Sequence, residues 1–352
     1  MVDVSVVINE YKRRSFVKEA IISAVLQNVP KDRYEIILVT DLNDNELDDL
    51  VAPYGHVIRY ADEKGGARYA KGIAEASGKV VAFLDDDDMF AQGKLKRVLD
   101  VYGFFKSLGL YRHTVTFVNE RGWPLAPPQG NPFISLRQHF LQHLSQFVNS
   151  HDSLRHLITR YRLKYRRLDN LVGKLSKDLQ DSYIKGSVAV TLSRYRYYFS
   201  KNLEREVRMF TKEEKEKAVR YLAEEIHRIN RNLYDPLYWL GFNSSSMTAL
   251  REPLLSYLDD ISKFYWGQDN AYVLIFLASD YGIVHEPLKL TLYRVHGRQI
   301  TFGGYDDKQA FVRKACNEYL ELRRLAEELR LESLIDIDKT EARWCKAYMQ
   351  GA

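Results

Sequence analysis

Residues 80–88 read VVAFLDDDD, an apolar run that passes directly into four consecutive carboxylates. The apolar run is typical of a strand that is covered on both faces, as in the parallel sheet of an α/β protein. Four neighbouring carboxylates repel one another, and their burial is costly unless a cation or strong hydrogen-bond donors compensate. The carboxyl ends of strands line the ligand crevice of an open α/β sheet. This stretch therefore predicts both an α/β layer and a ligand-binding site at the end of this strand.

The sequence around this stretch alternates between strand and helix patterns. Strands are expected at residues 4–8, 35–40, 57–60 and 80–84. Helices are expected at residues 15–27, with Ser15 as the N-cap, at 45–51 and at 66–76. Each strand–helix–strand unit is about 20–30 residues long, which permits a right-handed parallel crossover. The prediction is a doubly wound α/β layer with a mostly parallel central sheet and helices on both faces.

The composition is that of a globular protein, since 45% of the 352 residues are hydrophobic and 28% are charged. The net charge of +5 predicts no nucleic-acid partner, but it suits an anionic substrate or an acidic lipid surface. No run of about 18 apolar residues occurs, and the first strand begins without a signal-peptide layout, so we expect a cytoplasmic location. Cys316 and Cys345 lack the spacing of a zinc site and are expected to be ordinary residues of a reducing compartment.

The sequence after the first strand excludes two common nucleotide-binding motifs. Asn9-Glu10-Tyr11-Lys12 contains no glycine that would let a pyrophosphate approach the backbone, and no Walker sequence occurs. A sugar-phosphate nucleotidyltransferase would also need a glycine-rich loop here, which argues against that class. The four carboxylates leave two interpretations open: a Mg²⁺ or Mn²⁺ site that bridges the protein to a diphosphate, or a solvated acidic turn that caps a helix from about residue 92.

Four segments together resemble family 2 glycosyltransferases with the GT-A fold. They are residues 4–27 (VSVVINEYKRRSFVKEAIISAVLQ), 34–41 (YEIILVTD), 64–78 (KGGARYAKGIAEASG) and 80–88. The resemblance implies a GT-A-like layer in which the first two strands end at the nucleobase, and an Asp-x-Asp motif holds ribose and metal-diphosphate. By this resemblance, the donor contacts would be Asn9, Tyr11, Asp41, Arg68, Asp85 and Asp86, and a metal ligand would be Asp87.

Matching segments continue in the C-terminal half. Residues 241–251 (GFNSSSMTALR) resemble the acceptor-side segment of the family, and a strand pattern at 185–196 is a competing candidate. Gln268-Asp269 stands where the family usually has Glu-Asp, so the resemblance makes Asp269 the catalytic base. The alternative is that Asp269 only N-caps the apolar helix at 271–278. Gln268 also removes one negative neighbour that could raise the pKa of Asp269.

Residues 290–301 (LTLYRVHGRQIT) resemble the Tyr-Arg-x-His ending of the family's core. The resemblance implies that His296 ligates the metal or hydrogen-bonds a phosphate. Arg294 and Arg298 would neutralise the diphosphate oxygens.

The remaining sequence predicts an insertion and a tail around this core. The expected boundaries are 1–121 for the nucleotide-sugar-binding half, 122–238 for a mainly helical insertion, 239–304 for the acceptor half and 305–352 for a helical tail. Residues 154–168 have a basic amphipathic pattern with aromatics, which suits a membrane interface, and an ordinary surface helix is the alternative. The tail is expected to pack on the core or on a second subunit of a homodimer.

The predicted function is metal-dependent transfer of a sugar from a nucleotide-diphosphate donor to an acceptor hydroxyl. The resemblance implies inversion at the anomeric carbon, and a single base opposite the leaving group is consistent with it. The acceptor is expected to be lipid-linked or a polysaccharide, with peripheral contact at the inner face of the cell membrane. Two alternatives stay open: a sugar-phosphate nucleotidyltransferase, and a nucleotide-sugar-binding protein without turnover, which Gln268 keeps in consideration.

Overall fold

The computed structural model describes residues 2–12, 14–105, 108–125, 243–297, 299, 307–331 and 339–351. Its strands are β1 (Val4–Asn9), β2 (Tyr34–Thr40), β3 (Gly55–Arg59), β4 (Val80–Asp85), β5 (Met89–Phe90), β6 (Leu108–Val118), β7 (Met247–Leu250) and β8 (Gly282–Arg294). Its α-helices are α1 (Arg14–Val25), α2 (Asn45–Val51), α3 (Gly65–Glu75), α4 (Lys94–Phe104), α10 (Arg251–Leu255), α11 (Leu258–Ser262), α12 (Gln268–Ala278), α13 (Lys308–Glu328) and α14 (Lys339–Gly351). The described 3₁₀ helices are η1 (Lys31–Arg33) and η3 (Ser244–Ser246).

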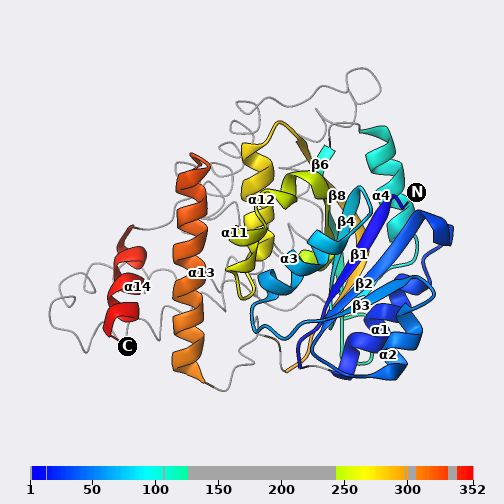
Figure 1. Ribbon diagram of the computed structural model, residues 1–352, viewed down its shortest axis with the longest axis horizontal. Coiled ribbons are helices and arrows are strands. Elements are labelled where there is room, and N and C mark those ends of the chain that lie inside the picture. Colours follow the sequence, from blue (N-terminus) through cyan, green and yellow to red (C-terminus); the bar gives the residue numbers. More distant parts are fainter. Residues whose placement is uncertain are drawn as a thin grey trace.

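The described strands form one sheet, in the order β3-β2-β1-β4-β7-β6-β8-β5. β1 pairs in parallel with β2 and β4, and β2 pairs in parallel with β3. Right-handed crossovers place α1 and α2 on one face of this half and α3 on the other (Figure 1). The predicted doubly wound α/β layer and its first four strands are therefore confirmed. The predicted N-cap at Ser15 is wrong, because α1 already begins at Arg14.

The strand order reverses between β1 and β4. The order runs outward from β1 to β3, and β4 then lies on the other side of β1. Such a switch point leaves a crevice beyond the carboxyl ends of the two strands. The register pairs Asn9 with Asp85, so the residues that follow β1 and the carboxylates that follow β4 begin at the same edge.

The C-terminal segment completes the sheet. β7 pairs antiparallel with β4, where Thr248 lies opposite Ala82. β6 lies between β7 and β8, antiparallel to β7 and parallel to β8. β5 follows the carboxylates directly and pairs with the end of β8, where Met89 lies opposite Leu292. Strands from the N-terminal and the C-terminal half of the sequence therefore lie in one sheet, beside the carboxylates that follow β4.

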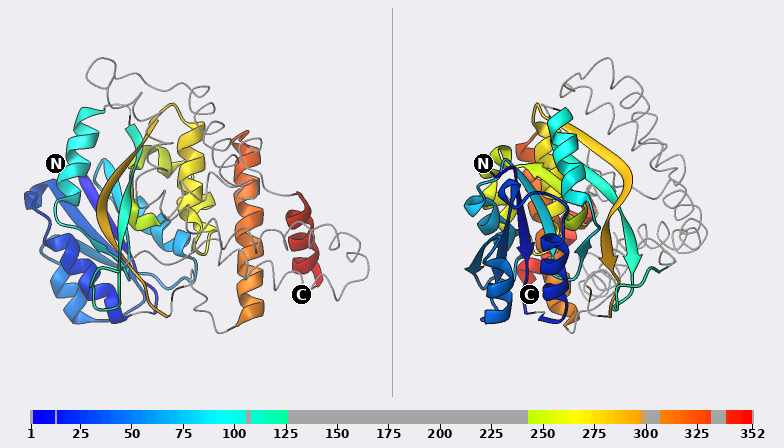
Figure 2. Two further views of the ribbon diagram at one scale, coloured as in Figure 1. Left: turned by 180° about the vertical axis from the view of Figure 1, so that it is seen from behind. Right: turned by 90° about the vertical axis from the view of Figure 1, so that its right-hand side faces the viewer.

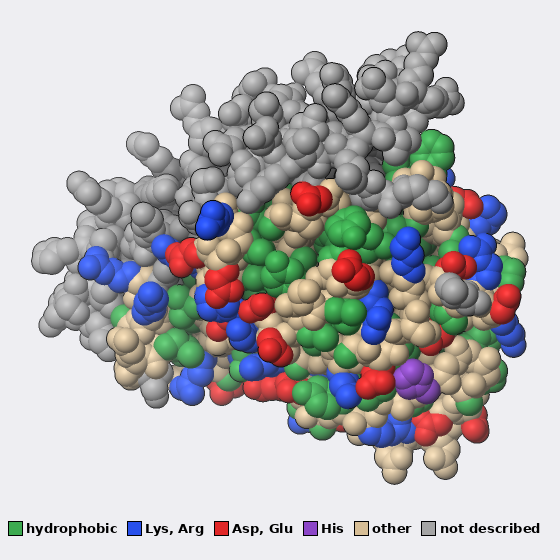
Figure 3. Space-filling view, turned by 45° about the horizontal axis from the view of Figure 1, so that its top comes forward, with side chains coloured by type: hydrophobic (Ala, Val, Ile, Leu, Met, Phe, Trp, Pro, Cys, Tyr) green, Lys and Arg blue, Asp and Glu red, His purple; other side chains and the backbone are tan. Residues whose placement is uncertain are grey.

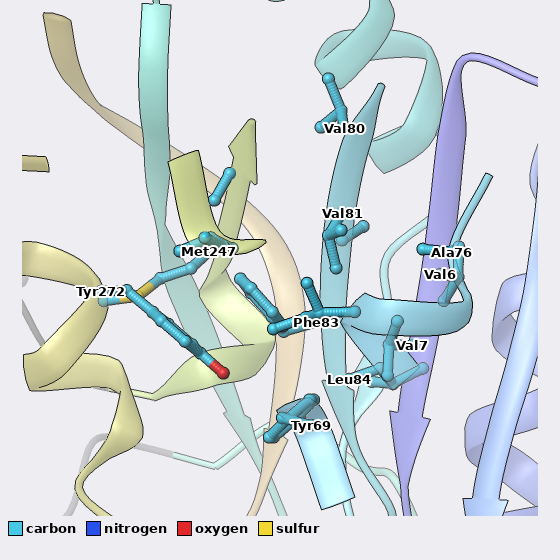
Figure 4. Packing of buried hydrophobic residues seen from close by; sticks show 14 of the residues in the cluster. Val6, Val7, Tyr69, Ala76, Val80, Val81, Phe83, Leu84, Met247 and Tyr272 are labelled. Atoms are coloured by element: carbon cyan, nitrogen blue, oxygen red, sulfur yellow. The ribbon is translucent and has the colours of Figure 1, made fainter. Parts of the chain in front are cut away.

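Aromatic contacts join β4 to helices from both halves of the chain. The Phe83 ring stacks on Tyr272 of α12 with centroids 4.4 Å apart, and it meets Tyr69 of α3 edge-on at 5.3 Å (Figure 4). α3 approaches the sheet closely at Gly72, where an added Cβ would lie 2.3 Å from Cγ1 of Val7. Close packing at this point places the side of α3 that carries Arg68 against the end of β1.

The predicted helical tail is confirmed by α13 and α14. α13 lies alongside α12, and α14 packs on the outer side of α13 (Figures 1 and 2). A disulfide between Cys316 and Cys345 joins the two tail helices. The expectation that these cysteines are ordinary residues of a reducing compartment is therefore wrong, because the packing of the two helices brings their sulfur atoms together.

The predicted insertion at 122–238 lies almost entirely outside the described residues, including the patterns at 154–168 and 185–196. Acidic and basic side chains are interspersed on the face of the described part that Figure 3 displays. Within that part of the chain, no helix combines the length and the apolar character that crossing a bilayer requires.

We expect Gly72→Ala to destabilise the protein, because the new methyl group would push α3 away from β1. Overpacking of this kind costs about 1–3 kcal/mol. Gly103 in α4 provides a matched control, since nothing lies within 4 Å of an added Cβ there, and alanine is the better helix former. Urea unfolding should show a lower free energy of unfolding for Gly72→Ala only, and equal effects in both variants would contradict the packing.

Candidate functional site

The carboxylates that follow β4 turn into the protein. Asp86 and Asp88 are each 1% exposed, and Asp87 is 7% exposed. Asn243 Nδ2 donates to Asp88 Oδ2 at 2.7 Å, and the backbone N–H of Arg294 donates to Asp88 Oδ1 at 3.0 Å. Burial raises the pKa of Asp88 well above its usual range, and the negative charges beside it raise it further. The solvated acidic turn is therefore the wrong interpretation.

The two predicted metal ligands lie side by side. His296 Nε2 is 3.0 Å from Asp87 Oδ2, both residues are buried, and the His296 ring packs against Phe16. A carboxylate oxygen and an imidazole nitrogen suit a divalent cation such as Mn²⁺, and Mg²⁺ usually keeps positions for phosphates and water. Among the residues described, no three Asp, Glu, His or Cys side chains form a group that could hold a metal ion. The pair therefore fits a cation only as a partial ligand set that a diphosphate completes.

The predicted nucleotide contacts gather at the end of β1. Arg68 of α3 donates from Nε to Asn9 Oδ1. The guanidinium carbon of Arg68 lies 4.7 Å from the centroid of the Tyr11 ring. The backbone N–H of Lys12 donates to Asp41 Oδ1 at 3.0 Å. The structure thus brings together four residues that the sequence places on three separate segments.

The serine turn, residues 243–246, connects the carboxylates to the C-terminal half of the site. The Ser245 hydroxyl accepts a hydrogen bond from the backbone N–H of Asp85 at 2.9 Å. The Ser244 hydroxyl accepts one from Nε2 of Gln268 at 2.9 Å. The segment proposed from sequence for the acceptor side therefore touches both the Asp-x-Asp motif and the start of α12.

Asp269 lies in the first turn of α12 and is 8% exposed. The N-cap position belongs to Gly267, so the alternative that Asp269 serves only as an N-cap is wrong. Burial raises the pKa of Asp269 well above its ordinary value, the N–H of Asn270 opposes this, and the charge of Asp85 raises it further. Gln268, the neighbour in sequence, adds no negative charge beside Asp269. Asp85, a neighbour in space, does.

Arg294 occupies a different place from the predicted one. Its fully buried guanidinium donates from Nε to the carbonyl of Asp87 at 2.9 Å. Its two other nitrogen atoms donate to the carbonyl of Glu120 and to the carboxylate of Glu19, and the group lies over the Phe16 ring. Instead of contacting a diphosphate, Arg294 fixes the backbone that carries Asp87.

Sequence reasoning misses two buried polar residues of the site. Lys94 is fully buried and donates from Nζ to the carbonyl of Ser245. Tyr272 carries a buried hydroxyl that finds no hydrogen-bond partner among the described residues, and burial together with the charge of Asp269 raises its pKa. A lysine on the buried side of α4 and a tyrosine inside an apolar helix are the signals that could have indicated them. Arg298, a predicted donor contact, lies outside the described residues.

Comparison with known families gives one match, in the N-terminal part of the sequence. Residues 5–158 match the family described as Glycosyl transferase family 2. This match confirms that the N-terminal part of the chain is similar to family 2 glycosyltransferases, as the sequence predicted. Because the family 2 match ends at residue 158, it does not include the serine turn, Asp269 or His296.

Curated relatives of the chain are also named as glycosyltransferases. TuaG of Bacillus subtilis (strain 168), named as a putative teichuronic acid biosynthesis glycosyltransferase, is 32% identical over 105 residues, which is 28% of this chain and 40% of the relative. An uncharacterized glycosyltransferase of Nostoc sp. (strain PCC 7120) is 32% identical over 121 residues, which is 31% of this chain and 36% of the relative. The chain therefore spans less than half the length of these relatives.

Solved structures with a similar arrangement include residues 1–349 of S. aureus TarS. That structure has a TM-score of 0.46 and 13% sequence identity, over 100% of this chain and 92% of the other. The same fragment in complex with UDP-GlcNAc has a TM-score of 0.46 and 12% identity, over 99% and 92% of the two chains. Values this low carry no information about the substrates of the present protein.

We expect Arg294→Met to lower the melting temperature of the protein in the absence of any donor. The carbonyls of Asp87 and Glu120 would lose their guanidinium donor, and the first of these is a buried acceptor, which costs about 1–3 kcal/mol when it is unsatisfied. Arg121→Met, at an exposed position beside Glu120, is the matched control and should change the melting temperature little. Calorimetry distinguishes the two roles, because an arginine that only binds the donor would leave the melting temperature of the free protein unchanged.

Proposed function

We propose that the protein transfers a sugar from a nucleoside-diphosphate donor to an acceptor hydroxyl, with a divalent cation and with inversion at the anomeric carbon. One observation carries this proposal: the serine turn hydrogen-bonds Asp85 of the carboxylate motif and Gln268, the residue before the buried candidate base Asp269. A base and a carboxylate motif that are linked in this way share one region of the protein. The family 2 match over residues 5–158 supports sugar transfer as the class of reaction.

The nucleotide would be held beyond the ends of β1 and β2. The Tyr11 ring, which has Arg68 and Lys12 Nζ over it at 4.7 Å and 4.9 Å from its centroid, would contact the nucleobase. Asn9 and Asp41 would supply hydrogen bonds to the base. Burial lowers the pKa of Arg68, and the charge of Asp86 opposes this. Asp86 would contact the ribose.

Asp87 and His296 would hold the cation, and the donor's diphosphate would complete its ligand shell. When bound, a divalent cation stabilises the negative charge that builds on the departing diphosphate. Asp85 is oriented by two hydroxyl groups, since Tyr69 donates to its Oδ1 at 2.9 Å and Ser245 accepts from its backbone N–H. The Ser245 hydroxyl also lies 3.5 Å from Asp85 Oδ2, and the carboxylate held in this way would contact the donor.

Asp269 would remove the proton of the acceptor hydroxyl as attack occurs. Three side-chain oxygen atoms are buried and find no hydrogen-bond partner among the described residues: those of Gln268 (Oε1) and Asn270 (Oδ1) on either side of Asp269, and that of Asn243 (Oδ1) beside Asp88. An unsatisfied buried acceptor is costly, so hydroxyl groups of the sugar or the acceptor are suitable partners for them. A single base and a single displacement would invert the anomeric carbon.

The acceptor would be a polysaccharide or a lipid-linked saccharide. A relative named for teichuronic acid biosynthesis supports this class of acceptor. Peripheral contact with the membrane through residues 154–168 belongs to the same proposal, whereas the Cys316–Cys345 disulfide gives no support to a cytoplasmic location. The four-part division of the chain, at 1–121, 122–238, 239–304 and 305–352, is proposed with it.

Asp269→Asn should lower kcat at least about 100-fold, because an amide of the same shape cannot accept the proton. A thermal-shift panel of nucleotide sugars, with and without Mn²⁺, identifies the donor, and release of nucleoside diphosphate measures turnover. Donor-induced stabilisation should survive in Asp269→Asn, and the exposed control Asp259→Asn should keep full turnover. Full turnover by Asp269→Asn would overturn the proposal, and a wild-type protein that binds a donor without any turnover would favour the binding-protein alternative.

The pH dependence of turnover follows from the raised pKa of Asp269. A base acts only when it is deprotonated, so turnover should rise as the pH rises through this pKa. The midpoint of the rise should lie well above 3.8, the ordinary value for an aspartate. A pH–rate profile measured where circular dichroism shows a folded protein checks this, and a midpoint close to the ordinary value would contradict a buried base.

A further inference from the structure

The tail helix α13 contacts the segment that immediately precedes the candidate base. The Trp266 ring stacks on Phe311 of α13, with centroids 5.7 Å apart and planes at 12°. Lys314 Nζ lies 5.0 Å from the Tyr265 ring centroid and 2.7 Å from Oε2 of Glu63, in the loop that leads to α3. One helix from the tail therefore contacts both the segment that precedes the candidate base and the loop that precedes α3.

Glu318 of α13 binds the backbone of residues 265–267. Its Oε1 accepts from the N–H of Tyr265, and its Oε2 accepts from the N–H of Gly267 at 2.7 Å. The residue is 9% exposed, and burial raises its pKa to about 8, although the backbone N–H groups oppose that shift. A Cβ on residue 267 would lie 2.4 Å from Glu318 Oε2, so the glycine leaves room for the carboxylate.

The first turn of α3 binds the opposite side of the same segment. The N–H of Gly65 donates to the carbonyl of Tyr265 at 2.9 Å, and the N–H of Gly66 donates to the carbonyl of Phe264 at 2.9 Å. A Cβ at Gly66 would lie 2.0 Å from the carbonyl oxygen of Ile261, so this approach requires glycine. The segment is therefore held by its carbonyls on the α3 side and by its N–H groups on the α13 side.

We infer that Glu318 is a positioning residue for the transfer reaction: it fixes the backbone at 265–267 and thereby the place where α12 presents Gln268 and Asp269. The inference rests on the proposed role of Asp269 as the base. α12 has no side-chain cap of its own at Gly267. Burying a carboxylate costs free energy, so packing alone does not explain Glu318 at this position. A carboxylate is suitable here because it accepts hydrogen bonds from the N–H groups that precede α12.

Hydrogen–deuterium exchange of the free protein tests the first half of this inference without any substrate. Above pH 8, where Glu318 is charged, peptides that cover 264–267 should exchange about tenfold faster or more in Glu318→Ala, because a hydrogen bond to a charged group is worth at least one factor of ten. Glu318→Gln keeps one accepting oxygen and should show a smaller increase. Glu327→Gln, near the end of the same helix, is the matched control and should leave these peptides unchanged.

Turnover and donor binding test the second half. In Glu318→Gln, kcat should fall about tenfold, whereas the thermal shift caused by the donor with Mn²⁺ should stay as in the wild type. Unchanged exchange at 264–267 in both Glu318 variants would overturn the inference. Faster exchange with normal turnover would overturn it too, by reducing Glu318 to a packing residue. Failure of the proposed function is recognised separately, by the absence of turnover in the wild-type protein.

Discussion

Every part of this site depends on keeping like charges close together inside the protein. Asp88 is held by Asn243 and by the backbone N–H of Arg294, and both partners come from the C-terminal half. Arg294 in turn holds the carbonyl of Asp87. These hydrogen bonds offset part of the repulsion between the carboxylates. Asp87 lies beside His296, where a cation and a diphosphate would offset the rest of that repulsion.

The base and the carboxylate motif are joined through the protein rather than through a substrate alone. The serine turn contacts Asp85 on one side and Gln268 on the other. The segment before α12 is held between α3, which carries Arg68, and α13, which carries Glu318. Donor side, base side and tail are thus parts of one hydrogen-bonded framework, so changes in one of them will be felt in the others.

The sequence predicts those features of the fold that depend on local periodicity and on strand ends. The four N-terminal strands and the position of the Asp run at a strand end follow from apolar runs and from the geometry of parallel sheets. The roles of Arg294 and of the two cysteines do not follow, because a sequence does not say which distant atoms a guanidinium or a thiol will meet. The raised pKa of Asp269 likewise comes first from its burial and then from the charge of Asp85, a neighbour in space only.

The pairing of β7 with β4 has a consequence for how the chain acquires its structure. The hydrogen bond between Asp85 and Ser245 joins residues 160 positions apart. During synthesis, the four N-terminal strands therefore emerge long before the strand that covers the edge of β4. That edge would stay open to other chains until β7 arrives, since an unpaired strand edge is a template for association. Contacts between residues so far apart in the sequence form slowly. Aggregation therefore competes with folding while only the N-terminal half has been made.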